Sequence, residues 1–89
     1  MEVTFDPPKD AENLRKHGIS LQRAKDFDFD AVLIKIDNSQ DYGEVRLIAI
    51  GWLIATLYSL TFTETPTGIH AISLRKATRQ EENDYAEEY

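Results

Sequence analysis

Two adjacent cations, Arg75 and Lys76, follow an apolar run that has the pattern of a β-strand and stand just before the expected start of a helix. Thr78 and Glu81 have the spacing of a capping box, in which each side chain satisfies a free backbone amide of the new helix. A cation held at such a corner has little freedom to move. The guanidinium group of Arg75 matches phosphate geometry and stays charged, so we expect this corner to bind phosphate. The alternative is a surface arginine that pairs with the acidic last helix.

Three further residues could do acid–base or phosphate chemistry. Glu44 and Arg46 are two apart in an expected strand, so their side chains share a face. They could act as a general base and a phosphate clamp, or they could simply form an ion pair. His70 is an acid–base candidate if it faces the open side of the sheet; otherwise it is an ordinary, partly buried histidine.

Strand parity places a constraint on this set. In an uninterrupted strand over 69–75, His70 and Leu74 lie on one face, and Ile69 and Arg75 lie on the other. His70 and Arg75 can therefore line one open face only if a bulge interrupts the strand or if Arg75 lies beyond its end.

The helices that must position these residues are indicated by their end signals. Asp6 and Pro7 are typical of a helix start, and Gly18 is the expected left-handed stop. Ser20 caps a second short helix that reaches Phe27. A final helix begins near Arg79, after the capping box.

The strands follow from alternating apolar residues bounded by turn residues. Extended segments are expected over 1–5, 31–37, 44–50, 53–63 and 69–75, with the third and fourth separated around Gly51. Short connections favour antiparallel pairing. We therefore expect an α+β fold in which an antiparallel sheet carries two N-terminal helices on one face and a short C-terminal helix.

Composition limits the classes of protein that fit. The 89 residues form one domain over 1–89, and without cysteine there is no disulfide or thiolate site. We find no secretion signal and no apolar run long enough to span a membrane, so we expect a cytoplasmic protein. The net charge of −6, from 10 Lys and Arg against 16 Asp and Glu, argues against broad electrostatic binding of nucleic acid. It leaves room for a small basic site on an acidic body.

A metal site has little support in the sequence. Asp26, Asp28 and Asp30 alternate as the first ligands of a calcium loop might, but neither the required glycine nor the closing glutamate follows in register. We expect no metal and no cofactor.

Several short motifs occur in one order along the chain: Phe5-Asp6-Pro7, Asn13 through Gly18, Gly43 through Arg46, and Ile72 through Thr78 with Tyr85. In order and spacing, they resemble the BrnT family of toxins. The resemblance implies a RelE-like ribonuclease fold and the toxin role in a type II toxin–antitoxin system. Such a toxin would be a metal-independent endoribonuclease that cleaves RNA and inhibits translation.

The resemblance also implies partners. It implies a BrnA-like antitoxin with a ribbon-helix-helix DNA-binding region, which neutralises the toxin. The two proteins would form a hetero-oligomer, with a possible toxin dimer, that represses its own operon, so operator DNA is contacted through the antitoxin. RNA is the expected substrate, and no membrane partner is expected.

RNA cleavage by the substrate's own 2′-hydroxyl group needs a base, an acid and stabilisation of charge on the phosphate. We assign these catalytic roles to Arg75, Arg46, Glu44 and His70, and RNA binding to Lys76, Arg79, Tyr85 and His17. Structural alternatives exist for the second group. Tyr85 could anchor the last helix, Lys76 could be solvated, and His17 suits the negative end of the first helix.

Two positions depart from the family pattern. Relatives often carry arginine where this chain has Thr65 and His70, and histidine replaces the charge of arginine only in part. The alternative function is therefore a catalytically weak or inactive toxin-like module whose main role is to bind an antitoxin or another partner protein.

Overall fold

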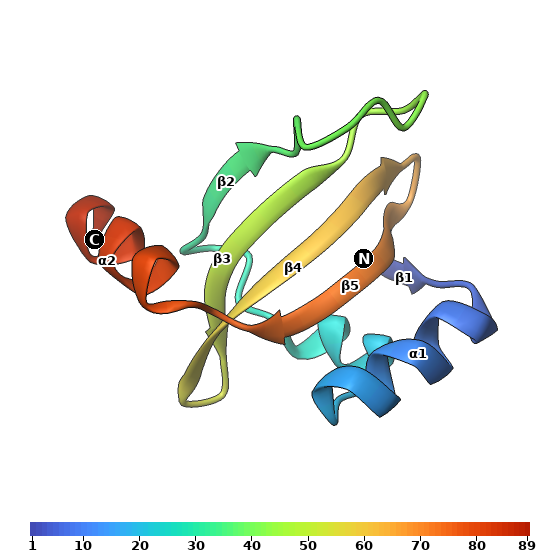
Figure 1. Ribbon diagram of the computed structural model, residues 1–89, viewed down its shortest axis with the longest axis horizontal. Helices are drawn as coiled ribbons and strands as arrows, with labels where there is room; N and C mark the ends of the chain where they lie inside the picture. The colour runs from blue at the N-terminus through green and yellow to red at the C-terminus, as the bar shows by residue number, and fades with distance from the viewer.

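A five-stranded sheet forms the centre of the structure, a computed structural model that describes residues 1–89 (Figure 1). In spatial order the strands are β1 (Glu2–Thr4), β5 (Gly68–Lys76), β4 (Thr56–Thr65), β3 (Leu47–Leu53) and β2 (Leu33–Ile36). The helices are α1 (Pro7–His17), the 3₁₀ helix η1 (Leu21–Asp26) and α2 (Arg79–Glu88).

The prediction of an antiparallel sheet is wrong, because the sheet contains both parallel and antiparallel pairings. β1 runs parallel to β5, with Thr4 opposite His70, while the other three pairings are antiparallel. Hairpin reasoning applies only to strands that are neighbours in the chain, and β1 joins the last strand instead. Gly68 makes the approach possible, since a Cβ atom there would overlap the backbone of Glu2.

The expectation of two N-terminal helices on one face is also wrong, because α1 is the only α-helix in that half of the chain. Ser20 does cap the next element, and its hydroxyl accepts from the amide of Gln22 at 3.2 Å. That element is the six-residue 3₁₀ helix η1, and the chain becomes extended again at Phe27. So short a segment cannot sustain the i to i−4 hydrogen bonds of an α-helix without further support.

Helix ends that depend on local residues form as predicted. Gly18 is left-handed (φ 71°) and its amide donates to the carbonyl of Leu14. Both bonds of the Thr78–Glu81 capping box are present, and α2 begins at Arg79. Asp6 stands at the N-cap of α1, but its side chain makes no capping hydrogen bond. Its carboxylate therefore stays available for other contacts.

Strand β3 begins later and ends later than its sequence pattern predicted. It runs through Gly51, and the chain turns at Ile54 and Ala55. A Cβ atom at Gly51 would lie 2.9 Å from the ring of Phe27, so this glycine accommodates packing rather than a turn. Glu44 and Arg46 consequently lie in the loop before β3 and not within the strand.

A β-bulge interrupts the pairing of β4 with β5. Thr61 pairs with Ser73 and Phe62 with Ala71, so Ile72 is the extra residue. The bulge reverses strand parity after Ile72. His70, Ser73 and Arg75 therefore share one face, and Ile69, Ala71 and Leu74 share the other, buried face. The interruption that His70 and Arg75 needed in order to share a face is present.

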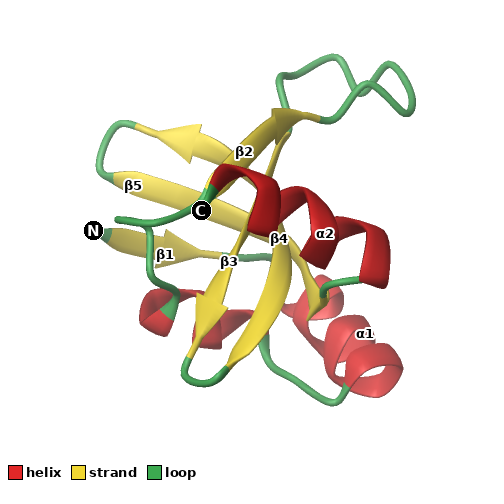
Figure 2. Ribbon diagram, turned by 90° about the vertical axis from the view of Figure 1, so that its left-hand side faces the viewer, coloured by secondary structure: helices red, strands yellow, loops and turns green.

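The two faces of the sheet carry separate apolar clusters. The larger one joins η1 to the face that carries Leu60, Phe62 and Leu74. The smaller one joins Ile50 and Leu57 to Tyr85 of α2 on the opposite face. Figures 1 and 2 show α1 and α2 on different sides of the sheet, which leaves part of the α2 side open.

Buried Asn13 joins α1 to β5. Its Nδ2 donates to the carbonyls of Ile19 and Leu74, each at 2.8 Å, and its Oδ1 accepts from the amide of Leu74 at 3.0 Å. Leu74 is the second residue after the bulge position. One side chain thus fixes α1 along the bulged edge of the sheet.

We expect Asn13→Ala to lower the free energy of unfolding by about 2–4 kcal/mol, because it leaves buried backbone groups without partners. Urea denaturation of the purified variant measures this change. Asn83→Ala is the matched control, since Asn83 lies exposed on α2. Equal losses for the two variants would show that the Asn13 network does not hold the fold together.

Candidate functional site

A cleft of about 170 Å³ lies where the loop before β3, strand β5 and the start of α1 meet. We call it the Arg46 cleft. Its lining consists of Asp6, Lys9, Glu44, Arg46, His70, Ala71 and Ile72. Three of the four predicted catalytic residues, Glu44, Arg46 and His70, are therefore brought together in it.

Sheet register explains this meeting. Leu47 pairs with Phe62, so Arg46 lies level with Thr63, and Thr63 pairs with His70. Neighbouring strands are about 4.8 Å apart, which places the backbones of Arg46 and His70 roughly 10 Å apart on one face. The long arginine side chain can cover Thr63 between them.

The guanidinium group of Arg46 has few partners. It lies over the ring of Tyr42, with 3.8 Å from Cζ to the ring centroid, and Nη2 is 3.4 Å from Oε1 of Glu44. Its Nε is buried and has no hydrogen-bond partner. The hydroxyl of Tyr42 donates to Asp37 at 3.0 Å, which holds the aromatic ring in place. Arg46 is thus oriented, yet it retains donors for an anion.

His70 is held from both sides of its ring. Nδ1 lies 2.8 Å from the hydroxyl of Thr4, and Nε2 lies 3.7 Å from Oδ1 of Asp6. The Thr4 hydroxyl is also within 3.5 Å of the carbonyl of Ile69, to which it can donate while accepting from Nδ1–H. In the tautomer that donates from Nδ1 to Thr4, Nε2 is the ring nitrogen on the side of Asp6.

Lys9 is a cleft residue that the sequence analysis did not assign. It lies on the first turns of α1 and lines the cleft together with Arg46 and His70. A signal was available: Lys9 is four residues before Asn13 and eight before His17, so all three share one face of the helix. Nothing in the sequence alone showed that this face meets β5.

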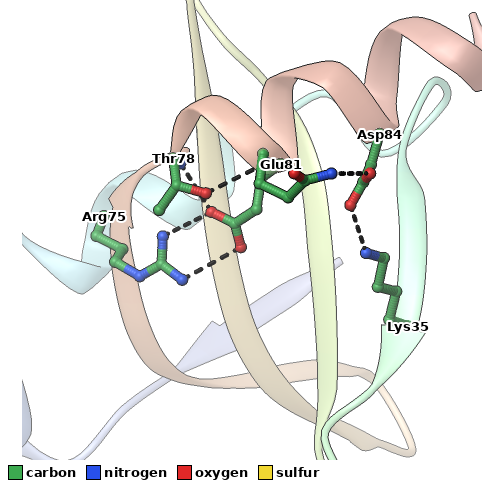
Figure 3. Close-up of polar contacts among 6 residues, drawn as sticks. Lys35, Arg75, Thr78, Glu81 and Asp84 are labelled. Carbon is green, nitrogen blue, oxygen red and sulfur yellow. Dashed lines mark hydrogen bonds and ion pairs between the residues drawn. The ribbon is translucent and has the colours of Figure 1, made fainter.

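Arg75 has a partner inside the protein. Its guanidinium binds the carboxylate of Glu81 through two hydrogen bonds, Nη1 to Oε1 at 2.7 Å and Nη2 to Oε2 at 3.2 Å (Figure 3). Arg75 lies outside the Arg46 cleft, although it shares the face of His70. The phosphate role of Arg75 stays a prediction.

The other predicted RNA-binding residues lie apart from one another. Lys76 pairs with Tyr58, which puts it on the face opposite Arg75, and Arg79 is exposed on the first turn of α2. His17 lines a second groove of about 190 Å³ between α1 and β5, which we call the α1 groove. Lys9, Glu12, Asn13, Lys16, His17, Ile72 and Ser73 line it.

Comparison with known protein families gives one match. A family model described as ribonuclease toxin, BrnT, of type II toxin–antitoxin system covers residues 5–81. The chain belongs to this family. Its members are ribonuclease toxins, and a type II toxin has an antitoxin partner. A comparison with curated proteins found no match.

The two departures from the BrnT pattern occupy different places. Thr65 ends β4, pairs with Gly68 and does not line the Arg46 cleft. His70 lies in the cleft beside Lys9 and Arg46. The cleft holds two cations, Lys9 and Arg46, whatever residue stands at position 65.

Aromatic and ionic contacts attach α2 to the five-stranded sheet. Tyr85 is buried, its hydroxyl donates to the carbonyl of Ala31 at 2.8 Å, and its ring contacts Trp52 and Tyr89. Tyr85 therefore anchors α2 to the sheet and to the segment before β2. Lys35 binds Asp84 at 2.9 Å on the same side (Figure 3).

None of the helices has the length and apolarity needed to cross a lipid bilayer. No three side chains of His, Cys, Asp or Glu gather into a metal-binding group.

Glu81 links the capping box to Arg75, and its pKa reflects both. Burial, the largest single effect, raises the pKa of Glu81, but the bonds from Arg75 and Thr78 together lower it below its ordinary value of 4.5. A carboxyl group whose pKa is lowered by folding stabilises the protein above its unfolded pKa. The contribution is lost as the pH falls through the folded pKa.

We expect Glu81→Gln to lower the free energy of unfolding at pH 7 by about 1–2 kcal/mol, and we expect the difference from the wild type to shrink below pH 4.5. Urea denaturation at a series of pH values measures it. Glu82→Gln is the control, because Glu82 is exposed and its side chain makes no bond. A difference that stays constant down to pH 3 would contradict the assignment.

Proposed function

We propose that this chain is a metal-independent endoribonuclease toxin that cleaves RNA at the Arg46 cleft and so inhibits translation in the cytoplasm. One observation carries the proposal. The cleft combines two permanent cations, Lys9 and Arg46, with two acid–base groups, Glu44 and His70. This set can supply each function that cleavage by a 2′-hydroxyl group requires.

The reaction assigns one role to each group. Glu44, as a carboxylate, takes the proton of the 2′-hydroxyl, and the freed oxygen attacks the adjacent phosphorus. The bond from phosphorus to O5′ breaks, and His70, as an imidazolium, gives its Nε2 proton to the leaving oxygen. The products are a 2′,3′-cyclic phosphate and a 5′-hydroxyl end. Thr4 holds the His70 ring at Nδ1 throughout, whereas Nε2 turns from Asp6 to the leaving oxygen.

Arg46 and Lys9 are the proposed stabilisers of charge on the phosphate. The only hydrogen bond of the two terminal nitrogens of Arg46 is the long one from Nη2 to Glu44, so they suit a forked contact with phosphate oxygens. Arg75 could join them only after releasing Glu81, and we therefore assign the first phosphate contact to Arg46.

We expect purified wild-type protein to degrade single-stranded RNA in excess EDTA. Arg46→Ala and His70→Ala should each slow cleavage by roughly 100-fold or more. Arg23→Ala is the control, because Arg23 forms an exposed pair with Asp26 away from the cleft. Gel analysis should show cyclic phosphate ends, and a 2′-deoxy residue at the cleavage position should prevent the reaction.

Folded wild-type protein that leaves RNA intact would contradict the enzymatic proposal, as would cleavage that EDTA abolishes. The first result would favour the alternative, a module that binds its partner without appreciable nuclease activity.

We further propose a BrnA-like antitoxin with a ribbon-helix-helix region as the partner. The net charge of −6 and the exposed glutamates of α2, including Glu82 and Glu88, suit a partner segment that carries positive charge. DNA binding by the complex would then be a property of the antitoxin, because the acidic toxin offers no broad surface for DNA.

We expect the product of a neighbouring reading frame to copurify with the tagged toxin as a hetero-oligomer and to suppress RNA cleavage. The complex should retard operator DNA in a gel-shift assay, whereas the toxin alone should not. A toxin that stays solitary when the two proteins are coexpressed would contradict this partner.

A further inference from the structure

The α1 groove adjoins the Arg46 cleft. The two cavities share Lys9 from the helix and Ile72 from the bulge. The helical side of the groove consists of residues 9, 12, 13, 16 and 17, which form one stripe along α1. The strand side consists of Ile72 and Ser73, where the bulge interrupts pairing. A polymer that crosses the cleft along the edge of β5 would enter the groove next.

The base of the groove is rigid. Asn13 lines it, and the side-chain amide of Asn13 makes hydrogen bonds to backbone atoms of Ile19 and Leu74. This network ties α1 to β5 at the level of Leu74. Ser73 faces it with a hydroxyl that makes no hydrogen bond to another side chain or to the backbone.

Positive charge gathers along this groove on an otherwise acidic protein. Two lysines, Lys9 and Lys16, line it, and Glu12 is the single acidic residue there; the ring of His17 adds two nitrogen atoms that can contact an anion or a base. Hydrogen bonding and charge from Lys16, with a smaller effect of Lys9, lower the pKa of Glu12. The charges of both lysines therefore act on one point of the groove.

The ion pair between Glu12 and Lys16 is open to solvent. Glu12 lies 2.6 Å from Lys16, but the two side chains are 45% and 51% exposed. An exposed pair of this kind adds little stability, so a phosphodiester group, which carries one negative charge, can compete with the carboxylate for Lys16. The ion pair marks where an anion is stabilised.

We propose that the α1 groove binds the phosphate of the nucleotide next to the scissile one, through Lys16, His17 and the hydroxyl of Ser73. Lys9 then lies between two successive phosphates of a single RNA strand. The inference rests on the proposed binding of RNA at the Arg46 cleft. It gives the enzyme a minimum substrate length, because a dinucleotide with one phosphate cannot fill both sites.

Binding to RNA that cannot be cleaved tests the groove apart from catalysis. The probes are a 2′-O-methyl dinucleotide and a 2′-O-methyl tetranucleotide without terminal phosphates, titrated at low ionic strength and followed by NMR chemical shifts of backbone amides. We expect the tetranucleotide to bind more tightly and to shift the amides of Ile72, Ser73 and the last turn of α1.

Three variants of α1 should separate the groove from general charge. Lys16→Ala should weaken tetranucleotide binding by roughly three- to tenfold and reduce its salt dependence by about one phosphate contact, with little effect on the dinucleotide. Glu12→Gln should tighten tetranucleotide binding. Arg15→Ala is the matched control, since it removes an exposed cation from the same helix that does not line the groove.

Equal losses for Lys16→Ala and Arg15→Ala would overturn the proposal, as would equal affinity for the two probes or no RNA binding at all. Cleavage and groove binding are separated by comparing His70→Ala, which should slow cleavage by roughly 100-fold, with Lys16→Ala, which should lower the affinity for the methylated tetranucleotide. RNA that binds in the groove but is never cleaved would refute the nuclease proposal alone. RNA that is cleaved without any effect of Lys16→Ala would refute the groove proposal alone.

Discussion

The hydrogen bonds of Asn13 are the constraint on which the arrangement of both cavities depends. The amide is buried, and it binds the segment after α1 and the amide and carbonyl of Leu74 on β5. Because the position of Leu74 follows directly from the bulge, this one side chain couples the helix to the irregular part of the strand. A hydrophobic residue of similar size would leave three backbone groups without partners. Lys9 and His17 are then placed on either side of this fixed point.

The proposed binding of phosphate depends on where charges are placed rather than on the net charge of the protein. The chain carries a net charge of −6, and even the Arg46 cleft holds Asp6 and Glu44 beside Lys9 and Arg46. A field of this kind does not attract nucleic acid from a distance. Contacts with phosphate must instead come from donors that are already oriented, such as the guanidinium group that lies over Tyr42. Binding at physiological salt is then expected to depend on a few short contacts.

Sequence patterns predicted the helix ends, which depend on neighbouring residues. They did not predict the strand pairing, which depends on residues far apart in the chain. The left-handed Gly18, the cap at Ser20 and the Thr78–Glu81 box depend on residues within one turn, and all three form. The parallel pairing of β1 and the exact position of the bulge depend on strands far apart in the chain, and no local signal encodes them. Glu44, Arg46 and His70 line one cleft, but Arg75 lies outside it, and Lys9 required the docking of α1 to be seen. The sequence offered a pair between Arg75 and the acidic last helix as an alternative, and the structure identifies Glu81 as the partner.

The pairing of the first strand with the last has a consequence for synthesis of the protein. Thr4 and His70, which hold one another in place, are 66 residues apart. The start of β5, from Gly68 to His70, must leave the ribosome before β1 can dock and before the histidine acquires its support. Closure over so long a loop is among the slower steps of folding. The proposed active centre of a nascent chain therefore stays unassembled until β5 has been made.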